Sequence, residues 1–179
     1  AGVSTATVSR ALSNPELLSQ TKLLAVKEAI KHTGYRVNRN ARNLRKQKAA
    51  AVLVLVPNLG NPFFSKILSG INKGFSGTDY SVLIADSESF DDKTQRIQNA
   101  FKDGQIDGLI SLDGAFSENE VAEISYDLID KPVVFACEWV ENTNFSSIRS
   151  DNDSGARLAV QHLYNLGHRK ITHISGPSS

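Results

Sequence analysis

Short continuous apolar runs recur along most of the chain, and helical patterns separate them. The longer runs cover residues 49–56, 81–86, 108–113, 132–137 and 171–175, and a shorter run covers 147–149. Continuous apolar runs are typical of strands that are buried on both faces, and their alternation with helices predicts a parallel sheet. We therefore expect an α/β domain over residues 49–179.

Local signals mark the ends of the helices between these runs. Asn61 and Pro62 can begin one helix, because asparagine caps helices and proline fits their first turn. Residues 117–120 read Ser-Glu-Asn-Glu, which is a capping box for a second helix. Gly167 can end a third helix, whose apolar positions have helical spacing.

The first 34 residues have a different pattern, in which short helices follow each other without a strand. Gly2 stands where a turn needs a positive φ angle, and Ser4 can cap the helix that follows. Val8 and Leu12 lie four residues apart and can form a buried stripe, on which another helix packs before it ends at Gly34. This pattern resembles a helix-turn-helix, in which one helix enters the major groove of DNA.

The remaining side chains of that first helix suit contact with DNA. They are short or form hydrogen bonds, and the candidates are Ser4, Thr5, Ala6, Thr7, Ser9, Arg10 and Ser13. Short polar side chains let a helix lie deep in the major groove, where their hydroxyls reach base edges or phosphates. The alternative is an ordinary amphipathic helix that is capped by a serine.

The charge along the chain is uneven. Residues 1–48 contain ten basic residues (Lys or Arg) and two acidic residues (Asp or Glu), which give a net charge of +8. Residues 49–179 contain ten basic and seventeen acidic residues, which give a net charge of −7. The overall charge of +1 hides this contrast. A basic module beside an acidic body is expected when one end of a protein meets phosphate.

Residues 38–48 join the two parts and are rich in Arg, Lys and Asn, without an acidic residue. Asn38 can cap a helix here, and Leu44 is an apolar side chain flanked by Arg42 and Arg45. An apolar wedge among basic residues is the composition that opens a minor groove, so we expect a helix that forms on DNA. A flexible, solvated linker is the alternative.

Length and composition allow one sizeable domain and a small one. The chain has 179 residues, of which 40% are hydrophobic. It shows one cysteine, no apolar run that could span a membrane and no signal peptide, so we expect a cytoplasmic protein without disulfides. The sequence contains no Met and opens inside a motif that needs a preceding helix, which indicates a fragment.

Polar and aromatic residues follow the predicted strands. Parallel sheets bind ligands at the carboxyl ends of their strands. The residues just past the runs are Asn58, Asp86, Asp113, Glu138 and Asp151, and the nearby aromatic residues are Phe63, Phe64 and Trp139. Rings and carboxylates together suit a small hydroxyl-bearing or heterocyclic ligand. The alternative is ordinary polar loops, with Phe64 on the core stripe of its helix.

Other constellations do not indicate catalysis or metal binding. His162, His168 and His173 lack the i,i+4 spacing of a helical metal site. Cys137 has no recognisable histidine-partner motif, so we expect it to pack rather than react. Glycine-rich phosphate-binding motifs are absent from the sequence. We therefore expect neither an enzyme nor a bound metal or other cofactor.

Several segments together resemble the lactose/galactose repressor (LacI/GalR) family. They are GVSTATVSRALSN, ARNLR, NPFFSKILSGI, QIDGLISL and residues 150–177. The resemblance implies a small all-α helix-turn-helix headpiece at 1–37, a hinge helix at 38–48 and a periplasmic-binding-protein-like core at 49–179, mainly its first lobe. Two departures are Val37, where the family usually has proline, and Leu23, where arginine is common.

The resemblance also implies a function. Members are transcriptional regulators, commonly repressors, that bind double-stranded operator DNA as homodimers under the control of a small effector. By position, Thr5 and Ala6 match base-reading residues, and Leu44 matches the minor-groove wedge. The matching effector positions are Phe63, Phe64, Asp113, Glu138, Trp139 and Asp151.

The resemblance leaves the effector open among nucleosides, purines and sugars, although the cytidine-responsive repressors look nearest. It also implies that the first headpiece helix and most of the second lobe lie outside this sequence. A periplasmic sugar-binding protein is the main alternative, and the basic residues 1–48 argue against it. An α/β enzyme with an accessory DNA-binding domain is a further alternative, but the sequence contains no catalytic motif that supports it.

Overall fold

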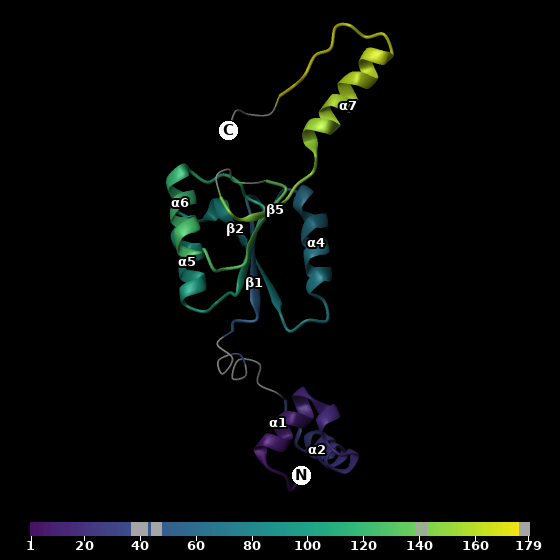
Figure 1. The fold of residues 1–179 in the computed structure, drawn as a ribbon, viewed down its shortest axis with the longest axis vertical. Coiled ribbons are helices and arrows are strands. Elements are labelled where there is room, and N and C mark those ends of the chain that lie inside the picture. Colours follow the sequence, from purple (N-terminus) through teal and green to yellow (C-terminus); the bar gives the residue numbers. More distant parts are fainter. Residues whose placement is uncertain (37–42, 44–47, 139, 141–142, 176–179) are drawn as a thin grey trace. The chain divides into compact units, whose positions relative to one another are not determined.

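A computed structural model describes residues 1–36, 43, 48–138, 140 and 143–175 of the chain. The chain divides into two compact units, Ala1–Lys46 and Gln47–Ser179 (Figure 1). The predicted hinge helix falls almost entirely outside the described residues. The same is true of its candidate DNA contacts, Asn38, Arg42, Leu44 and Arg45.

The first unit is helical, as predicted. Its elements are α1 (Thr5–Ser13), the 3₁₀ turn η1 (Pro15–Leu17) and α2 (Gln20–Thr33). Gly2 has a φ angle of +60°, and Ser4 caps α1 by accepting a hydrogen bond from the backbone N–H of Thr7. Gly34 ends α2 in the left-handed conformation, with a φ angle of 64°. Both glycines therefore provide backbone conformations that other residues adopt at a cost.

The core of this unit is small. Val26 of α2 is 1% exposed, and Val8 of α1 is half-buried. Leu12 is 41% exposed, so its predicted place in a buried stripe is wrong. Leu12 lies in the last turn of α1, where Ser13 and Asn14 are exposed as well.

The second unit contains a five-stranded parallel sheet with the strand order β2-β1-β3-β4-β5. The strands are β1 (Ala51–Val56), β2 (Ser81–Asp86), β3 (Gly108–Ser111), β4 (Val133–Ala136) and β5 (Ser146–Ile148). In the centre of the sheet Val54 pairs with Ile84 on one side and with Ile110 on the other. This arrangement confirms the predicted α/β fold with a parallel sheet.

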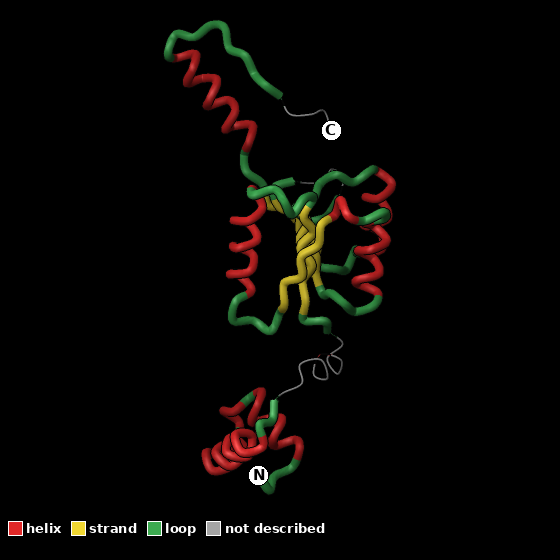
Figure 2. Tube along the Cα trace, turned by 180° about the vertical axis from the view of Figure 1, so that it is seen from behind, coloured by secondary structure: helices red, strands yellow, loops and turns green. Residues whose placement is uncertain are grey.

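Helices cover both faces of this sheet (Figures 1 and 2). The elements are α4 (Phe63–Phe75) on one face, and α5 (Lys93–Lys102) and α6 (Glu118–Asp127) on the other, with η2 (Ser87–Ser89) between β2 and α5. Leu53 and Leu55 of β1 pack in the cluster on the α5 and α6 side, whereas Val54 and Val56 pack with Phe64 of α4. β1 is thus buried on both faces, which explains its uninterrupted apolar sequence.

Hydrogen-bonded caps set the helix starts. The capping box is confirmed, because Ser117 accepts from the N–H of Glu120 while the Glu120 carboxylate accepts from the N–H and hydroxyl of Ser117. These hydrogen bonds hold the pKa of Glu120 below its ordinary value of about 4.5. α4 begins at Phe63, one residue later than expected, and the Asn61 side chain accepts from the Phe63 N–H at 3.0 Å.

One predicted strand is wrong. Residues 171–175 form no strand, and they follow α7 (Asn152–Asn165), which is exposed along its whole length. A strand needs a neighbouring strand for its backbone hydrogen bonds, and none lies beside 171–175 in the described part of the chain. The helix itself is confirmed, and Gly167 follows it with a φ angle of 94°.

Among the described residues, none of the helices combines the length and apolar character that crossing a bilayer requires.

Candidate functional site

α1 presents one continuous face of short and hydrogen-bonding side chains. Residues at i, i+1, i+4, i+5 and i+8 share one face of a helix, and here they are Thr5, Ala6, Ser9, Arg10 and Ser13, all exposed. The opposite face carries the half-buried Thr7, Val8 and Ala11. Burial therefore separates most of the predicted DNA-contacting residues from the side that packs.

Several hydroxyls on α1 stabilise the helix itself. Ser4 Oγ lies 3.0 Å from Thr7 Oγ1 and 3.3 Å from the Thr7 backbone nitrogen. Ser13 Oγ donates to the Ser9 carbonyl at 2.9 Å. Ser4 and Thr7 thus determine where α1 begins, and the positive end of the helix dipole lies beside the exposed Thr5 and Ala6. A helix start of this kind favours a nearby phosphate.

At the carboxyl edge of the sheet, Asp86 connects two loops. Its Oδ2 atom accepts from the backbone N–H of Leu59 at 3.1 Å, and its Oδ1 atom accepts from that of Glu88 at 3.0 Å. Asn58 Oδ1 accepts from the Gly60 N–H at 2.8 Å in the same β1–α4 loop. The end of β2 is therefore tied to the loop that leads into α4.

Asp113 lies at the centre of a second hydrogen-bonded network and is 5% exposed. Its Oδ1 atom accepts from the Ala115 N–H at 2.8 Å, and its Oδ2 atom accepts from Ser87 Oγ at 2.7 Å and from Lys93 Nζ at 3.2 Å. Lys93 Nζ also donates to the Ala115 carbonyl and lies 4.0 Å from the centre of the Phe116 ring. Because both carboxylate oxygens have internal partners, Asp113 holds the loops together rather than presenting an open acceptor.

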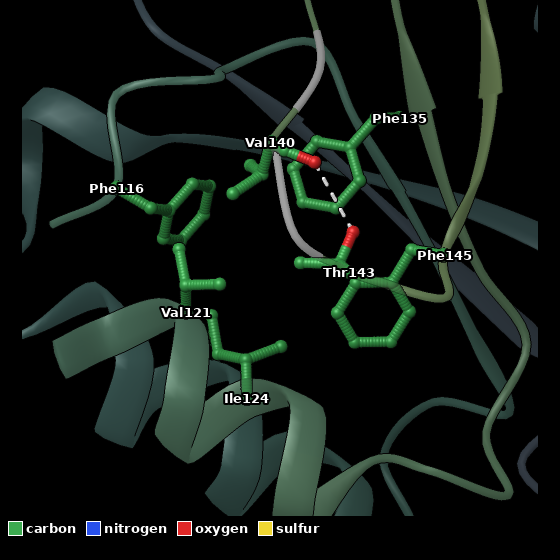
Figure 3. A pocket seen from close by; sticks show the side chains of 7 residues that line it. All are labelled: Phe116, Val121, Ile124, Phe135, Val140, Thr143 and Phe145. Carbon is green, nitrogen blue, oxygen red and sulfur yellow. Dashed lines mark hydrogen bonds between the residues drawn. The ribbon is translucent and has the colours of Figure 1, made fainter. Parts of the chain in front are cut away.

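An aromatic cluster lies beside this network (Figure 3). The rings of Phe116 and Phe135 meet edge to face at 5.8 Å, and Phe145 lies 5.9 Å from Phe135. Val121 and Ile124 of α6, together with Val140 and Thr143, complete the lining of a narrow apolar hollow (Figure 3). The side chains fill this hollow so closely that no ligand fits between them, whereas pockets for drug-sized ligands have volumes of about 300–1,000 Å³. We interpret it as the apolar support of the 113–117 loop.

A second hollow, of about 380 Å³, adjoins the aromatic cluster, with which it shares Thr143 and Phe145. Its lining comes from the end of α6 and the amino ends of β4 and β5, and includes Ser125, Lys131 and Ser146. Ligands of parallel α/β sheets bind at the carboxyl edge instead. We therefore do not assign the predicted effector to this hollow.

The two predicted phenylalanines at the start of α4 have different environments. Phe63 is 60% exposed, whereas Phe64 is 8% exposed and belongs to the core cluster of β1 and α4. Their ring centres are 5.2 Å apart with an angle of 78° between the planes. Burial thus favours the packing alternative for Phe64, and Phe63 is the ring that a ligand can reach.

The remaining predicted effector residues are acidic or aromatic. Glu138 and Asp151 are exposed, and Trp139 falls outside the described residues. Asp151 caps α7 by accepting from the Ser154 N–H at 3.0 Å, and this hydrogen bond lowers the pKa of Asp151. Asp151 is consequently an anion near neutral pH, with part of its hydrogen-bonding capacity used by α7.

Cys137 follows β4 in the left-handed conformation, with a φ angle of 74°. Burial, and secondarily the charge of Glu138, raise the pKa of the Cys137 thiol above its ordinary value. A raised pKa keeps the thiol protonated at neutral pH, and a protonated thiol is a poor nucleophile. This environment favours packing over reaction. Among the described residues, no group of three or more His, Cys, Asp or Glu could hold a metal ion.

The partners of Asp113 were not predicted from the sequence. Ser87 in η2 and Lys93 at the start of α5 are separated from it by 26 and 20 residues. No local pattern distinguishes Lys93 from other lysines near a helix start. Asp107 was also missed, although an Asp-Gly pair directly before a buried run was a signal for a loop side chain that binds the backbone at the strand start.

Two family descriptions match the chain. "Bacterial regulatory proteins, lacI family" matches residues 1–38, and "Periplasmic binding proteins and sugar binding domain of LacI family" matches residues 49–179. The HTH-type transcriptional repressor CytR of Escherichia coli (strain K12) is 34% identical over 177 residues, which are 99% of this chain and 51% of that protein.

Solved structures are similar as well. A crystal structure of the Lac repressor bound to ONPG in the repressed state has a TM-score of 0.73 and 25% identity, over 94% of this chain and 51% of that one. A periplasmic binding protein/LacI transcriptional regulator from Alkaliphilus metalliredigens QYMF, complexed with D-xylulofuranose, has a TM-score of 0.53 and 31% identity, over 72% of this chain and 46% of that one.

The chain spans about half the length of the curated relatives it matches. The match at 49–179 covers more than half of the chain, and a second match covers its helical unit. The resemblance found in the sequence is therefore confirmed, and the chain belongs to the LacI family of bacterial regulatory proteins.

Proposed function

We propose that this chain is part of a transcriptional repressor that binds operator DNA and responds to a small-molecule effector. The observation that carries the proposal is the exposed face of α1, where short polar residues and Arg10 lie together in the basic part of the chain. The acidic second unit has the sheet architecture of a ligand-binding lobe. The proposal assigns residues 1–37 to the headpiece, 38–48 to the hinge and 49–179 to the effector core.

In this proposal α1 reads the major groove. Thr5 and Ala6 approach base edges, because they lie on the exposed face beside the positive helix start. Ser9 and Arg10, one turn later on the same face, contact phosphates or bases. Leu44 enters the minor groove from the hinge.

The effector would bind at the carboxyl edge of the sheet. Phe63 offers an exposed ring for stacking, and Glu138 and Asp151 offer exposed carboxylates that accept hydrogen bonds. Asp113 has a supporting role, since internal partners occupy its carboxylate. A sugar or a nucleoside fits this chemistry, and the relative from Alkaliphilus metalliredigens was solved with D-xylulofuranose.

We further propose that the regulator acts as a homodimer in the cytoplasm and catalyses no reaction. Paired half-sites on DNA match a two-fold symmetric protein, and the DNA of a bacterium lies in its cytoplasm. β2 is an edge strand on which Leu83 and Ile84 are 43% and 48% exposed, and a second copy of the chain could cover them.

A periplasmic sugar-binding protein is the second candidate. It has support because the family description that matches 49–179 includes periplasmic binding proteins. Binding to DNA distinguishes the two candidates experimentally. The match at 1–38 to bacterial regulatory proteins favours the repressor.

The DNA-binding part can be tested with the full-length protein. Duplexes selected from a random pool define an operator, and fluorescence anisotropy at several salt concentrations gives its affinity. Arg10→Ala should weaken operator binding and reduce the salt dependence by about one counterion, as expected for the loss of a phosphate contact. Lys102→Ala removes the same charge from α5 and should change neither quantity. If the protein binds no selected duplex more tightly than random DNA, the proposed repressor function is refuted.

The effector-binding part can be tested by thermal shift of the same protein with cytidine, adenosine, guanine and ribose. A ligand that binds the folded state raises the midpoint temperature. For any ligand that does so, Phe63→Ala should weaken the response, whereas Tyr126→Ala removes another exposed ring from α6 and should preserve it. An unchanged response in Phe63→Ala would exclude the stacking role of Phe63.

A further inference from the structure

Asp107 binds the backbone at the start of the second unit. Its Oδ1 atom accepts from the N–H of Ala49 at 2.8 Å, and its Oδ2 atom accepts from the N–H of Ala50 at 2.8 Å. Hydrogen bonds from backbone N–H groups to a carboxylate are stronger than those between neutral groups. The Asp107 side chain thus holds two successive residues that are 58 and 57 positions away in the sequence.

The backbone at Ala50 adopts a conformation that suits this contact. Ala50 has a φ angle of 51°, in the left-handed region that non-glycine residues seldom occupy. A left-handed residue can turn successive N–H groups toward the same point and so form a concave binding site for an anion. The Asp107 carboxylate occupies such a site, which offsets the strain at Ala50.

Further hydrogen bonds fix the same segment on both sides. The Ser81 N–H, at the start of β2, donates to the Ala50 carbonyl at 2.9 Å. The Asp107 N–H, directly before β3, donates to the Ala51 carbonyl at 2.8 Å. The first residues of the sheet are therefore held by both neighbouring strands and by the Asp107 carboxylate.

This position matters because of what lies on either side of it in the sequence. Ala49 directly follows residues 38–48, the proposed hinge between the headpiece and the core. β3 begins one residue after Asp107, and it ends at Ser111, which bonds to the backbone of Asp113 at the proposed effector edge. One short buried strand thus connects the attachment of the hinge with the effector edge.

We propose that Asp107 is a positioning residue for DNA binding, whose carboxylate fixes the point and direction at which the hinge leaves the core. The inference rests on the proposed function, since it concerns how a DNA-binding headpiece is carried. Without the carboxylate, Ala49 and Ala50 gain conformational freedom that operator binding must remove again. The headpieces of a dimer then have a lower effective concentration at their half-sites.

The test uses the full-length protein with Asp107→Asn, which keeps the size of the side chain. An amide cannot accept both N–H groups, because one of its two terminal atoms is itself a donor. Asp130→Asn makes the same change of charge at an exposed position and is the matched control. Hydrogen exchange followed by NMR reports the protection of the Ala49 and Ala50 amides, and anisotropy reports affinity for the selected operator and for random duplex.

We expect Asp107→Asn to speed exchange at both amides and to weaken operator binding about tenfold, with far-UV circular dichroism unchanged. Asp130→Asn should match the wild type. A merely structural role would lower the denaturation midpoint but leave the operator affinity of the folded protein unchanged.

Wild-type operator affinity in Asp107→Asn, together with lost amide protection, would overturn the positioning role and leave the proposed repressor intact. Amides that stay protected in Asp107→Asn would also overturn it, since the carboxylate would then not hold them. A wild-type protein without operator preference would refute the proposed function, and the positioning role would fall with it.

Discussion

Replacing Lys93 with methionine should destabilise the second unit strongly. The Lys93 and Asp113 side chains are 14% and 7% exposed, and Nζ lies 3.2 Å from Oδ2. Removing one partner of a buried ion pair costs about 3–5 kcal/mol, because the other charge stays buried. The substitution also removes a donor from the Ala115 carbonyl and the cation from the face of Phe116.

The expected loss lies near the lower end of that range. Asp113 keeps hydrogen bonds from Ser87 Oγ and from the Ala115 N–H, so its carboxylate remains partly compensated. We therefore expect a loss of about 3 kcal/mol in the free energy of unfolding. With a urea m-value of about 1–3 kcal/mol/M, the midpoint should fall by roughly 1–3 M.

The chain contains a matched control for this experiment. Lys102 and Asp127 are also 3.2 Å apart, but their side chains are 61% and 29% exposed. An exposed ion pair contributes about 0–1 kcal/mol, so Lys102→Met should shift the midpoint only slightly.

Urea denaturation can be followed by the fluorescence of Trp139, since the sole tryptophan of the sequence belongs to the second unit. Equal losses in Lys93→Met and Lys102→Met would show that burial does not strengthen the Lys93 contact. A double-mutant cycle with Asp113→Asn should give a coupling free energy above about 1 kcal/mol. A value near zero would refute the direct interaction.

Three further predictions concern helix ends. Ser117→Ala should lower the free energy of unfolding by about 1 kcal/mol at pH 7 and raise the pKa of Glu120. Because folding lowers the pKa of Glu120, the part of this stability that depends on the Glu120 charge is present above about pH 4.5 and is lost as the pH falls through the pKa of the folded state. Urea denaturation at several pH values can measure this loss. Gly34→Ala should destabilise the helical unit by about 1–2 kcal/mol, because Gly34 has a positive φ angle. Gly70→Ala, at an open position of α4 without a positive φ angle, should be neutral or slightly stabilising. Thermal melts in which both substitutions lower the midpoint temperature would contradict this reasoning. Ser4→Ala should cost about 1 kcal/mol of helix stability, visible as reduced ellipticity at 222 nm on heating, and an unchanged melt would exclude the cap.

Much of the fold was predictable because its signals are local. The Ser117 cap, the left-handed Gly34 and the apolar run of β1 each depend on the residue itself and on neighbours a few positions away. Hydrophobic periodicity and capping chemistry act at this range. The candidate face of α1 could be predicted for the same reason, since helical spacing determines which side chains share a side.

The hydrophobic pattern gave wrong predictions where burial depends on elements that are distant in the sequence. Residues 171–175 look like a strand, yet a strand forms only where a neighbour supplies hydrogen-bond partners, and the described chain places none beside them. Leu12 has the spacing of a core residue but is 41% exposed among the described residues. In both cases the residue types are compatible with burial, but no described element packs over them.

The order of apolar and polar residues therefore specifies the helices, most of the strands, the parallel sheet and the separation of a basic head from an acidic core. The tertiary structure decides which charged side chains are buried and which groups they contact. Asp113 meets Lys93 at the carboxyl edge of the sheet, and Asp107 meets the amides of Ala49 and Ala50 at the amino edge, because parallel strands bring segments from distant positions together at each edge. The physical reason is the range of the forces: backbone preferences act over a few residues, whereas a buried carboxylate takes its partners from wherever the sheet brings donors within about 3 Å.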